Sequence, residues 1–288
     1  MLAQGNAVAY APVIPEKVHF ADRVVDLDRI DFYERMDREM ISFAFGHTNT
    51  LLTIKRANRY VPGIVKILKE QGVPEDLVYF AAIESHYDNA AVSSAKAVGM
   101  WQFMPSTAKE YGLEVNEYVD ERLDCDKSTV AACKYFKRAY AKYKCWLTVA
   151  AAYNAGMGRI SKSLETQDVE HALDLYLNKE TSRYIFRLLA MKLIIENPAR
   201  YGYAIKANQL YQPLDCDTFV VAEPVKDWVQ WSKEHNITYS LLREYNPWIR
   251  SVSLPNPNNK TYVVKIPKET SLYRSKQTLK TYRENWTR

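Results

Sequence analysis

Residues 77–87 form a largely apolar segment with a single carboxylate, and their spacing predicts a helix that starts near residue 74 and runs to about residue 87. At about 100° per residue, Glu84 falls on the same arc as four apolar side chains, those of Leu77, Phe80, Ala81 and Tyr87. Burial disfavours the charged form of a carboxyl group and raises its pKa, so such a group can keep a proton near neutral pH. A general acid needs this retained proton. Glu84 is therefore either a general acid or a structural glutamate in a buried ion pair with Arg122, Arg159 or Lys192.

The stretch 93–105 carries groups suited to sugar recognition. Gln102 offers donors and an acceptor for hydroxyl and acetamido groups. Gly99 can adopt backbone angles that other residues avoid, which lets the backbone approach a ligand closely. The neighbouring Trp101 and Phe103 are either core residues, the commoner role in a helical domain, or stacking platforms for sugar rings.

A second carboxylate, Asp88, follows Glu84 by four residues. Four helical residues rise about 6 Å, which lies within the separation of about 5–9 Å between the two carboxyl groups of ordinary glycosidases. Asp88 is either a partner of Glu84 or a solvated helix end, and we favour the helix end.

The elements that must position these residues are helical between residues 24 and 202. Helical patterns cover residues 26–70 in two runs, residues 74–87, Pro105 to Gly112, a segment capped by Asp126 or Ser128, Trp146 to Asn154, and Glu180 to Glu196. After about residue 203 the sequence no longer has a helical pattern throughout. Residues 218–221 and 261–266 are rich in β-branched and aromatic residues, which predicts strands. Two helical patterns between them predict a strand–helix–helix–strand unit within residues 203–268. Residues 1–23 are expected to be an N-terminal extension, and residues 269–288 a loosely helical or disordered tail.

Composition sets broad limits on the class of protein. The 288 residues are 47% hydrophobic and 25% charged, as in a globular protein, and their net charge is +5. This charge suits an acidic polymer or an ordinary solvated surface, and we expect no nucleic-acid partner. No apolar run reaches the roughly 18 residues of a membrane span, and residues 1–20 lack the pattern of a signal peptide. Either the protein is cytosolic or the chain begins after a removed signal.

The four cysteines fit no zinc-binding spacing and leave two disulfides or free buried thiols open.

In combination, several blocks resemble the soluble lytic transglycosylase catalytic domain, the goose-type lysozyme-like fold of glycoside hydrolase family 23. They are Glu84-Ser85-His86-Tyr87, Ser93, Gly99, Gln102-Phe103-Met104-Pro105-Ser106-Thr107-Ala108 and Ala152-Tyr153-Asn154-Ala155-Gly156. Flanking blocks are similar to the membrane-bound lytic transglycosylase D branch: residues 71–77, 120–124 and 180–184. The resemblance covers about residues 25–200, with its motif core at 70–200. Residues 216–267, including Tyr245-Asn246-Pro247, look like a divergent LysM module of βααβ form. The expected fold class is therefore mainly α, with a small α+β module.

The resemblance implies a role for each matching position. Glu84 matches the catalytic acid. The groove around the sugar at the cleavage point is matched by Ser93, Gln102, Met104, Tyr153 and Asn154. Glu180 and Tyr184 match a second, mostly orienting layer. The resemblance implies no metal and no cofactor, and it gives Glu84 no catalytic partner at Asp88.

Two positions depart from the family pattern. The family usually has Gly at the position of Lys96, and Asn-Pro at Asp88-Asn89. Lys96 leaves the shape of its loop open and adds a cation that can face an anionic substrate. Neither change touches the acid.

The expected activity is cleavage of the β-1,4 bond between N-acetylmuramic acid and N-acetylglucosamine in peptidoglycan, which leaves a 1,6-anhydromuramyl end. The alternatives are a lysozyme-type hydrolase on the same fold and a catalytically silent glycan-binding protein. The LysM-like module is expected either to bind glycan or to steady the enzyme. The expected setting is a monomer acting on glycan strands in the periplasm or cell envelope, and association with the outer membrane through a missing N-terminal anchor is left open.

Overall fold

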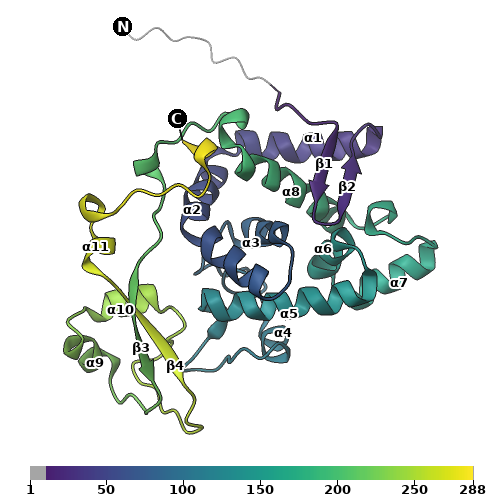
Figure 1. Cartoon of the computed structure of the whole chain (residues 1–288). Helices are drawn as coiled ribbons and strands as arrows, with labels where there is room; N and C mark the ends of the chain where they lie inside the picture. Colours follow the sequence, from purple (N-terminus) through teal and green to yellow (C-terminus); the bar gives the residue numbers. More distant parts are fainter. Residues whose placement is uncertain (1–10, 288) are drawn as a thin grey trace, which may run out of the picture.

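The computed structural model describes residues 11–287 and is mainly helical, with a small α+β module at one end (Figure 1). The helices of the larger, helical body are α1 (Ile30–Phe45), α2 (His47–Glu70), α3 (Val78–Ser85), α4 (Pro105–Glu110), α5 (Cys125–Tyr143), α6 (Trp146–Ala155), α7 (Met157–Gln167) and α8 (Lys179–Glu196). The module contains β3 (Cys216–Val221), α9 (Trp228–Glu234), α10 (Tyr239–Tyr245) and β4 (Tyr262–Pro267), followed by α11 (Glu269–Leu272). This arrangement confirms the mainly helical fold class with a βααβ unit.

Helix α3 lies in the middle of the helical body, with α2 and α8 packed against it (Figure 1). Every residue of α3 is buried except Glu84, which is partly exposed. The apolar arc predicted from periodicity therefore does not separate a core face from a solvent face. Instead, all sides of the helix are enclosed, and only its last turn reaches the surface at Glu84.

The ends of several helices differ from the sequence prediction. The predicted helix over 74–87 begins with a 3-10 turn at Glu75–Leu77 and stops at Ser85, because His86 and Tyr87 both adopt left-handed backbone angles, with φ of 54° and 53°. The cap of α5 is Asp124 and not one of the two predicted residues, Asp126 and Ser128. Its carboxylate accepts the amides of Asp126 and Lys127 at 3.0 Å each.

The N-terminal segment contains an antiparallel hairpin, β1 (Lys17–Phe20) and β2 (Arg23–Asp26), which the sequence did not predict. Val18 and Phe20 are buried in the main core. The extension expected over residues 1–23 therefore includes packed structure from residue 17 onward, while its first ten residues lie outside the described part.

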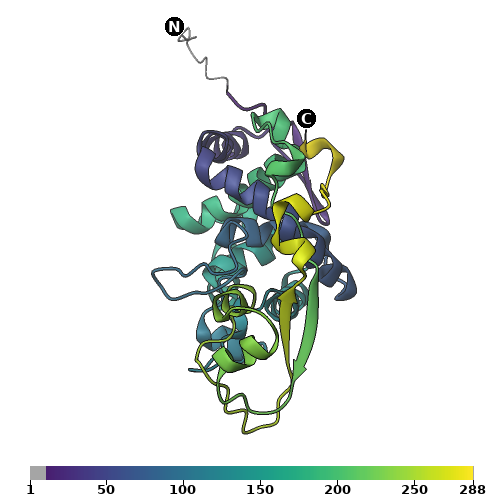
Figure 2. The same cartoon turned by 90° about the vertical axis from the view of Figure 1, so that its left-hand side faces the viewer.

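The C-terminal module pairs β3 with β4 in antiparallel register, with Cys216 opposite Pro267 and Val221 opposite Tyr262. Figure 2, in which the module faces the viewer, shows the two strands side by side. A second hydrophobic cluster, separate from the main core, surrounds Trp228 and Leu242 of the module. The boundaries expected at residues 202 and 268 stay predictions.

After α11 the chain returns to the helical body, where Trp286 is buried in the main core. The tail expected to be loosely helical or disordered is thus anchored near its end. All four cysteines are free thiols, two of them buried, so the two-disulfide alternative is not realised: Cys125, Cys133, Cys145 and Cys216. Across residues 11–287 no helix has the length and apolar character that crossing a membrane requires.

Candidate active site

Glu84 lies on the last turn of α3 and contacts α8 through a short hydrogen bond. The hydroxyl of Tyr184, itself buried, donates to Glu84 Oε1 at 2.6 Å. No ion pair involves Glu84 among the described residues. Two of the three cations considered from the sequence are paired elsewhere, since Arg122 contacts Asp120 and Lys192 contacts both Asp76 and Glu196. The structural ion pair considered for Glu84 is therefore not formed.

The electrostatic surroundings of Glu84 hold its proton near neutrality. Burial of the carboxyl group is the largest effect and raises its pKa to about 7. The hydrogen bond from Tyr184 and the positive charge of Arg187 stabilise the carboxylate and lower the pKa, whereas the negative charge of Glu180 raises it. Near pH 7 both the protonated and the ionised form of Glu84 are therefore populated. This carboxyl group can therefore donate a proton and accept one back at the same pH.

Contacts between aromatic rings join α3, which carries Glu84, to α6 and α8. Phe80, one turn earlier on α3, meets Tyr153 and Tyr184 edge-on, with ring centroids 5.4 and 6.1 Å apart. The Tyr153 hydroxyl donates to the carbonyl of Trp101 at 2.6 Å. Trp101 and Phe103 are themselves buried, which confirms core packing over exposed stacking platforms for these two rings.

Residues 91–104, here named the site loop, are tied together by their own backbone and side chains. Ser93 Oγ accepts the amide of Ala97 at 2.9 Å. Gln102 Nε2 donates to the carbonyls of Gly99 and Ala91, at 2.9 and 3.2 Å. The amide nitrogen of Gln102 is thus engaged in holding the loop, and its amide oxygen is the group left to meet a ligand.

A buried ion pair fixes the site loop to residues 120–123. Both oxygens of Asp120 accept from the Arg122 guanidinium, at 2.9 and 2.8 Å. Arg122 Nη1 then donates to the carbonyls of Lys96 and Phe103, at 3.2 and 3.1 Å. Gly99 has a φ of 83°, and a Cβ atom there would lie 2.0 Å from the Arg122 carbonyl oxygen, so only glycine fits.

The other residues singled out from the sequence lie on neighbouring elements. Asn154 is in the last turn of α6, partly exposed. Met104 is 42% exposed and immediately precedes α4. Glu180 is exposed in the first turn of α8, one turn before Tyr184. The structure thus brings Tyr184, Tyr153 and Glu180 near Glu84, whereas no described hydrogen bond joins Glu84 to Ser93, Gln102, Met104 or Asn154.

Sequence reasoning missed Arg187, whose charge acts on Glu84 and also lowers the pKa of His86, where burial is the larger cause. A signal existed, because Glu180, Tyr184 and Arg187 are spaced i, i+4, i+7 and share one face of α8.

Asp88 lies beyond the end of α3 and forms an ion pair with Arg56 at 2.7 Å. It is therefore a turn residue and not a partner of Glu84. Within residues 11–287 no group of three or more His, Cys, Asp or Glu side chains is arranged to hold a metal ion.

The helical domain that carries Glu84 and the βααβ module that follows it each match a known family of domains. Residues 64–173 match the family model of the transglycosylase SLT domain, and residues 217–270 match that of the soluble lytic transglycosylase C-terminal LysM-like domain. The chain therefore carries an SLT transglycosylase domain followed by a LysM-like domain. It is homologous to membrane-bound lytic murein transglycosylase D of Escherichia coli strain K12, with 31% identity over 219 residues that cover 74% of this chain and 47% of that protein.

Two further proteins are similar over part of their length. A protein of Alteromonas sp. strain M-1 named for tributyltin chloride resistance is 26% identical over 185 residues, which cover 63% of this chain and 89% of its own. The crystal structure of the 70-kDa soluble lytic transglycosylase SLT70 from Escherichia coli has a TM-score of 0.42 and 19% identity, over 59% of this chain and 30% of that one. The chain spans about half the length of the transglycosylase D that it matches.

Proposed function

We propose that this protein is a peptidoglycan lytic transglycosylase with Glu84 as its catalytic acid. The observation that carries the proposal is the Glu84 carboxyl, with a pKa of about 7 and a 2.6 Å hydrogen bond from Tyr184, inside an SLT transglycosylase domain. A carboxyl group whose two protonation states are both populated near neutral pH suits both proton transfers of the reaction.

The reaction follows from having one carboxyl group available. Protonated Glu84 donates to the β-1,4 oxygen that leaves C1 of N-acetylmuramic acid, and the muramyl 2-acetamido carbonyl stabilises the cation-like centre. The ionised Glu84 then takes the proton of the C6 hydroxyl as that oxygen bonds to C1. The attack is intramolecular, so it gains from proximity and needs no water. The product is a 1,6-anhydromuramyl end, and the proton on Glu84 is restored.

Substrate contacts are assigned to the residues around this carboxyl. Ser93, Gln102, Met104, Tyr153 and Asn154 line the path of the sugar at the cleavage point. Glu180 and Tyr184 orient Glu84 and tune its charge, in line with their contributions to its pKa. No metal or cofactor takes part.

Mass spectrometry of sacculi digested by the purified chain tests the activity. We expect 1,6-anhydromuramyl ends, and Glu84→Gln should lose at least about 1,000-fold in rate because the amide has no acidic proton to donate. Asp88→Asn is the matched control and should keep most of the activity. Reducing ends would identify a lysozyme-type hydrolase, and no cleavage at all a glycan-binding protein.

Location and attachment follow from the substrate. We propose that the protein works in the cell envelope, in the periplasm, as a monomer on glycan strands, where the LysM-like module binds N-acetylglucosamine-containing glycan. A pull-down of the full chain with sacculi, with and without competing chito-oligosaccharides, tests the binding. Association with the outer membrane through an N-terminal anchor is a further proposal, tested by fractionation of cells that express the protein from its own gene.

A further inference from the structure

The C-terminal module and the helical body share one hydrophobic core. Three buried residues of the body, Val98, Val119 and Leu123, belong to the same cluster as residues of the module, among them Trp228, Trp248, Ile249 and Val264. Val98 lies within the site loop. The packing of the site loop is therefore completed by the module as well as by the helices.

Backbone hydrogen bonds join the module to residues 113–123, here named the junction loop. The amide of Asp120 donates to the carbonyl of Trp248 at 2.9 Å, and the amide of Arg250 donates to the carbonyl of Tyr118 at 2.8 Å. Between them, Val119 and Ile249 form an antiparallel bridge and are both fully buried. This pairing resembles one edge of a β-ladder, which fixes the register of the two segments.

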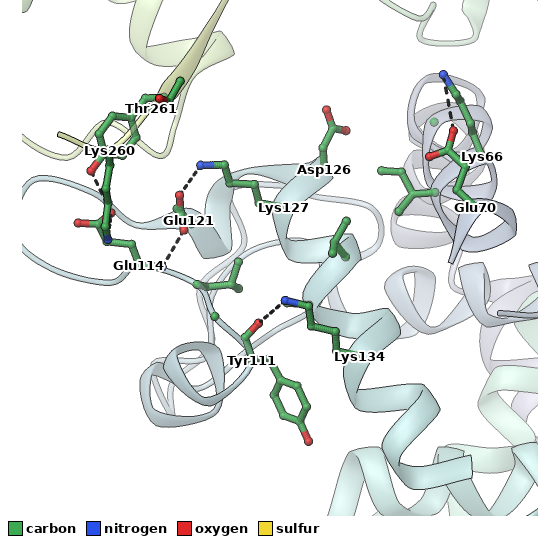
Figure 3. A pocket seen from close by; sticks show the side chains of 17 residues that line it. Lys66, Glu70, Tyr111, Glu114, Glu121, Asp126, Lys127, Lys134, Lys260 and Thr261 are labelled. Carbon is green, nitrogen blue, oxygen red and sulfur yellow. Dashed lines mark hydrogen bonds and ion pairs between the residues drawn. The ribbon is translucent and has the colours of Figure 1, made fainter. Parts of the chain in front are cut away.

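Polar contacts also join the junction loop to the module, and Figure 3 shows one of them, between Lys260 and Glu114. Glu114 of the junction loop accepts from Lys260 Nζ at 3.0 Å and from the Tyr262 hydroxyl at 2.9 Å. Partial burial raises the pKa of Glu114, but the hydrogen bonds from Lys260 and Tyr262 and the positive charge of Lys260 lower it by more. The pKa therefore lies below its usual value, and the carboxyl group is charged at neutral pH. Tyr262 also stacks on Trp248, with ring centroids 5.4 Å apart.

The junction loop contacts the site loop through Asp120 and Arg122. Asp120 donates its amide to the module and holds the Arg122 guanidinium with its carboxylate. Arg122 in turn binds two carbonyls of the site loop and presses its own carbonyl against Gly99. The contacts from Trp248 to the segment that carries Gln102 are thus continuous.

We infer that the LysM-like module is a positioning element of the active site, acting through Ile249, Asp120 and Arg122 on the site loop. This inference rests on the proposed transglycosylase activity and adds to it. The module sets the geometry of the cleavage point even for a substrate too short to reach the glycan-binding surface expected of such a module.

The test uses the full-length chain and a soluble muropeptide tetrasaccharide. Ile249→Ala removes apolar contact from the module side of the junction, and Tyr262→Phe removes one hydroxyl from Glu114. Both should lower kcat, by on the order of 10- to 100-fold for Ile249→Ala and less for Tyr262→Phe, with KM changed less than threefold and sacculus binding unchanged. Ile249→Val should restore most of kcat. Val220→Ala, at a 71% exposed position on β3, is the matched control.

Hydrogen exchange gives a readout that does not depend on activity. The amide of Gly99 donates to the carbonyl of Ala91 at 2.8 Å, and we expect it to exchange faster in Ile249→Ala and Tyr262→Phe than in Val220→Ala. If Ile249→Ala fails to fold, Tyr262→Phe decides alone. Unchanged kcat and unchanged Gly99 exchange would overturn the inference, as would a loss confined to sacculi. An inactive wild-type chain would refute the proposed function instead. The exchange of the Gly99 amide would still test whether the module positions the site loop.

Discussion

Two opposing effects at Glu84 set the pH range in which it can act. Burial favours the neutral acid, while the Tyr184 hydroxyl and the Arg187 charge favour the carboxylate. Without these two groups the acid would hold its proton too tightly to donate it well. Without burial it would already be ionised near pH 5. The balance puts its pKa at about 7, where both forms are populated.

Tyr184→Phe should therefore move the pH profile upward. Activity requires protonated Glu84, so kcat/KM is expected to fall with rising pH above about 7 in the wild type. Loss of the hydroxyl that stabilises the carboxylate raises the pKa of Glu84 and shifts this alkaline limb by roughly one pH unit to higher pH. Tyr153→Phe is the control, because the Tyr153 hydroxyl donates to a backbone carbonyl and its loss should leave the limb in place. A limb that stays at the same pH in both variants would show that another group titrates.

Glu84→Gln should stabilise the fold in a pH-dependent way. In the unfolded chain the Glu84 pKa is about 4.5, and folding raises it to about 7. Below pH 4.5 both states carry the proton, and the wild type loses stability as pH rises from 4.5 through 7. The variant lacks this loss, so its free energy of unfolding should exceed that of the wild type by about 1–3 kcal/mol at pH 8 and match it at pH 4. We expect the lower part of that range, because Glu84 keeps some exposure.

Urea unfolding at pH 4, 6 and 8 measures this difference. Glu223→Gln, at an exposed position, is the control and should change the free energy of unfolding by less than about 0.5 kcal/mol at each pH. An equal effect of Glu84→Gln at all three pH values would contradict a pKa raised by folding.

At the scale of single elements, the sequence predicts the helices well and their ends less well. Periodicity and capping signals place α6 and α8 within one residue of their observed bounds, and the two runs predicted within residues 26–70 correspond to α1 and α2, whereas α7 was not predicted. The predicted end of α3 was wrong. The two residues after Ser85 adopt left-handed backbone angles, and neither is a glycine or asparagine that would indicate such angles in the sequence. His86 and Tyr87 adopt these angles through tertiary contacts: Tyr87 is fully buried, and Thr53 hydrogen-bonds the His86 ring at 3.0 Å.

Lys96, where the family usually has glycine, has an unfavourable backbone conformation in the structure. Its φ is 67°, a left-handed conformation that costs a residue with a Cβ atom about 1 kcal/mol or more, and glycine is the usual residue there in the family. We expect Lys96→Gly to raise the free energy of unfolding by about 0.5–1 kcal/mol, after the greater flexibility of the unfolded chain is counted. The matched control is Ser94→Gly at an exposed position of ordinary φ, which should lower it by about 0.5–1 kcal/mol. Thermal unfolding of the two variants gives the comparison. A loss of stability in Lys96→Gly equal to that in Ser94→Gly would mean that residue 96 is not strained.

At the scale of the whole molecule, the sequence patterns missed some of the contacts that fix segments to one another. The hairpin at residues 17–26 was missed because its strands are only four residues long, too short to show alternation. Arg122 was considered as a partner for Glu84, yet it pairs with Asp120, two residues away. One long-range contact of the site was anticipated by the family resemblance. It named Tyr184, which lies 100 residues from Glu84 in the chain and donates a hydrogen bond to it.

The end of the chain closes over the helical body and supplies part of its core. Asn58 of α2 donates to the Lys280 carbonyl at 3.0 Å and accepts the Tyr282 amide at 2.9 Å, and the Asn285 side chain donates to the Glu196 carbonyl at 2.9 Å. These contacts lead to Trp286, which is 1% exposed and lies 5.8 Å from the Tyr282 ring. The tail is thus held by the Asn58 side chain of α2 and by the Glu196 carbonyl of α8, the same two helices that pack against α3.

Trp286→Ala should therefore destabilise the helical body, although only two residues follow Trp286 in the sequence. Removing a fully buried indole leaves a cavity and should lower the free energy of unfolding by about 3–5 kcal/mol. If the tail detaches instead, the loss is smaller and the tail becomes sensitive to proteases. Trp286→Phe should lose less than half as much, because the smaller ring fills part of the space. Tyr273→Ala, at a 55% exposed position in the same tail, is the control. Urea unfolding together with limited proteolysis distinguishes the two forms of the effect. A Trp286→Ala protein with wild-type stability and wild-type resistance to proteases would show that the tail contributes nothing to the core.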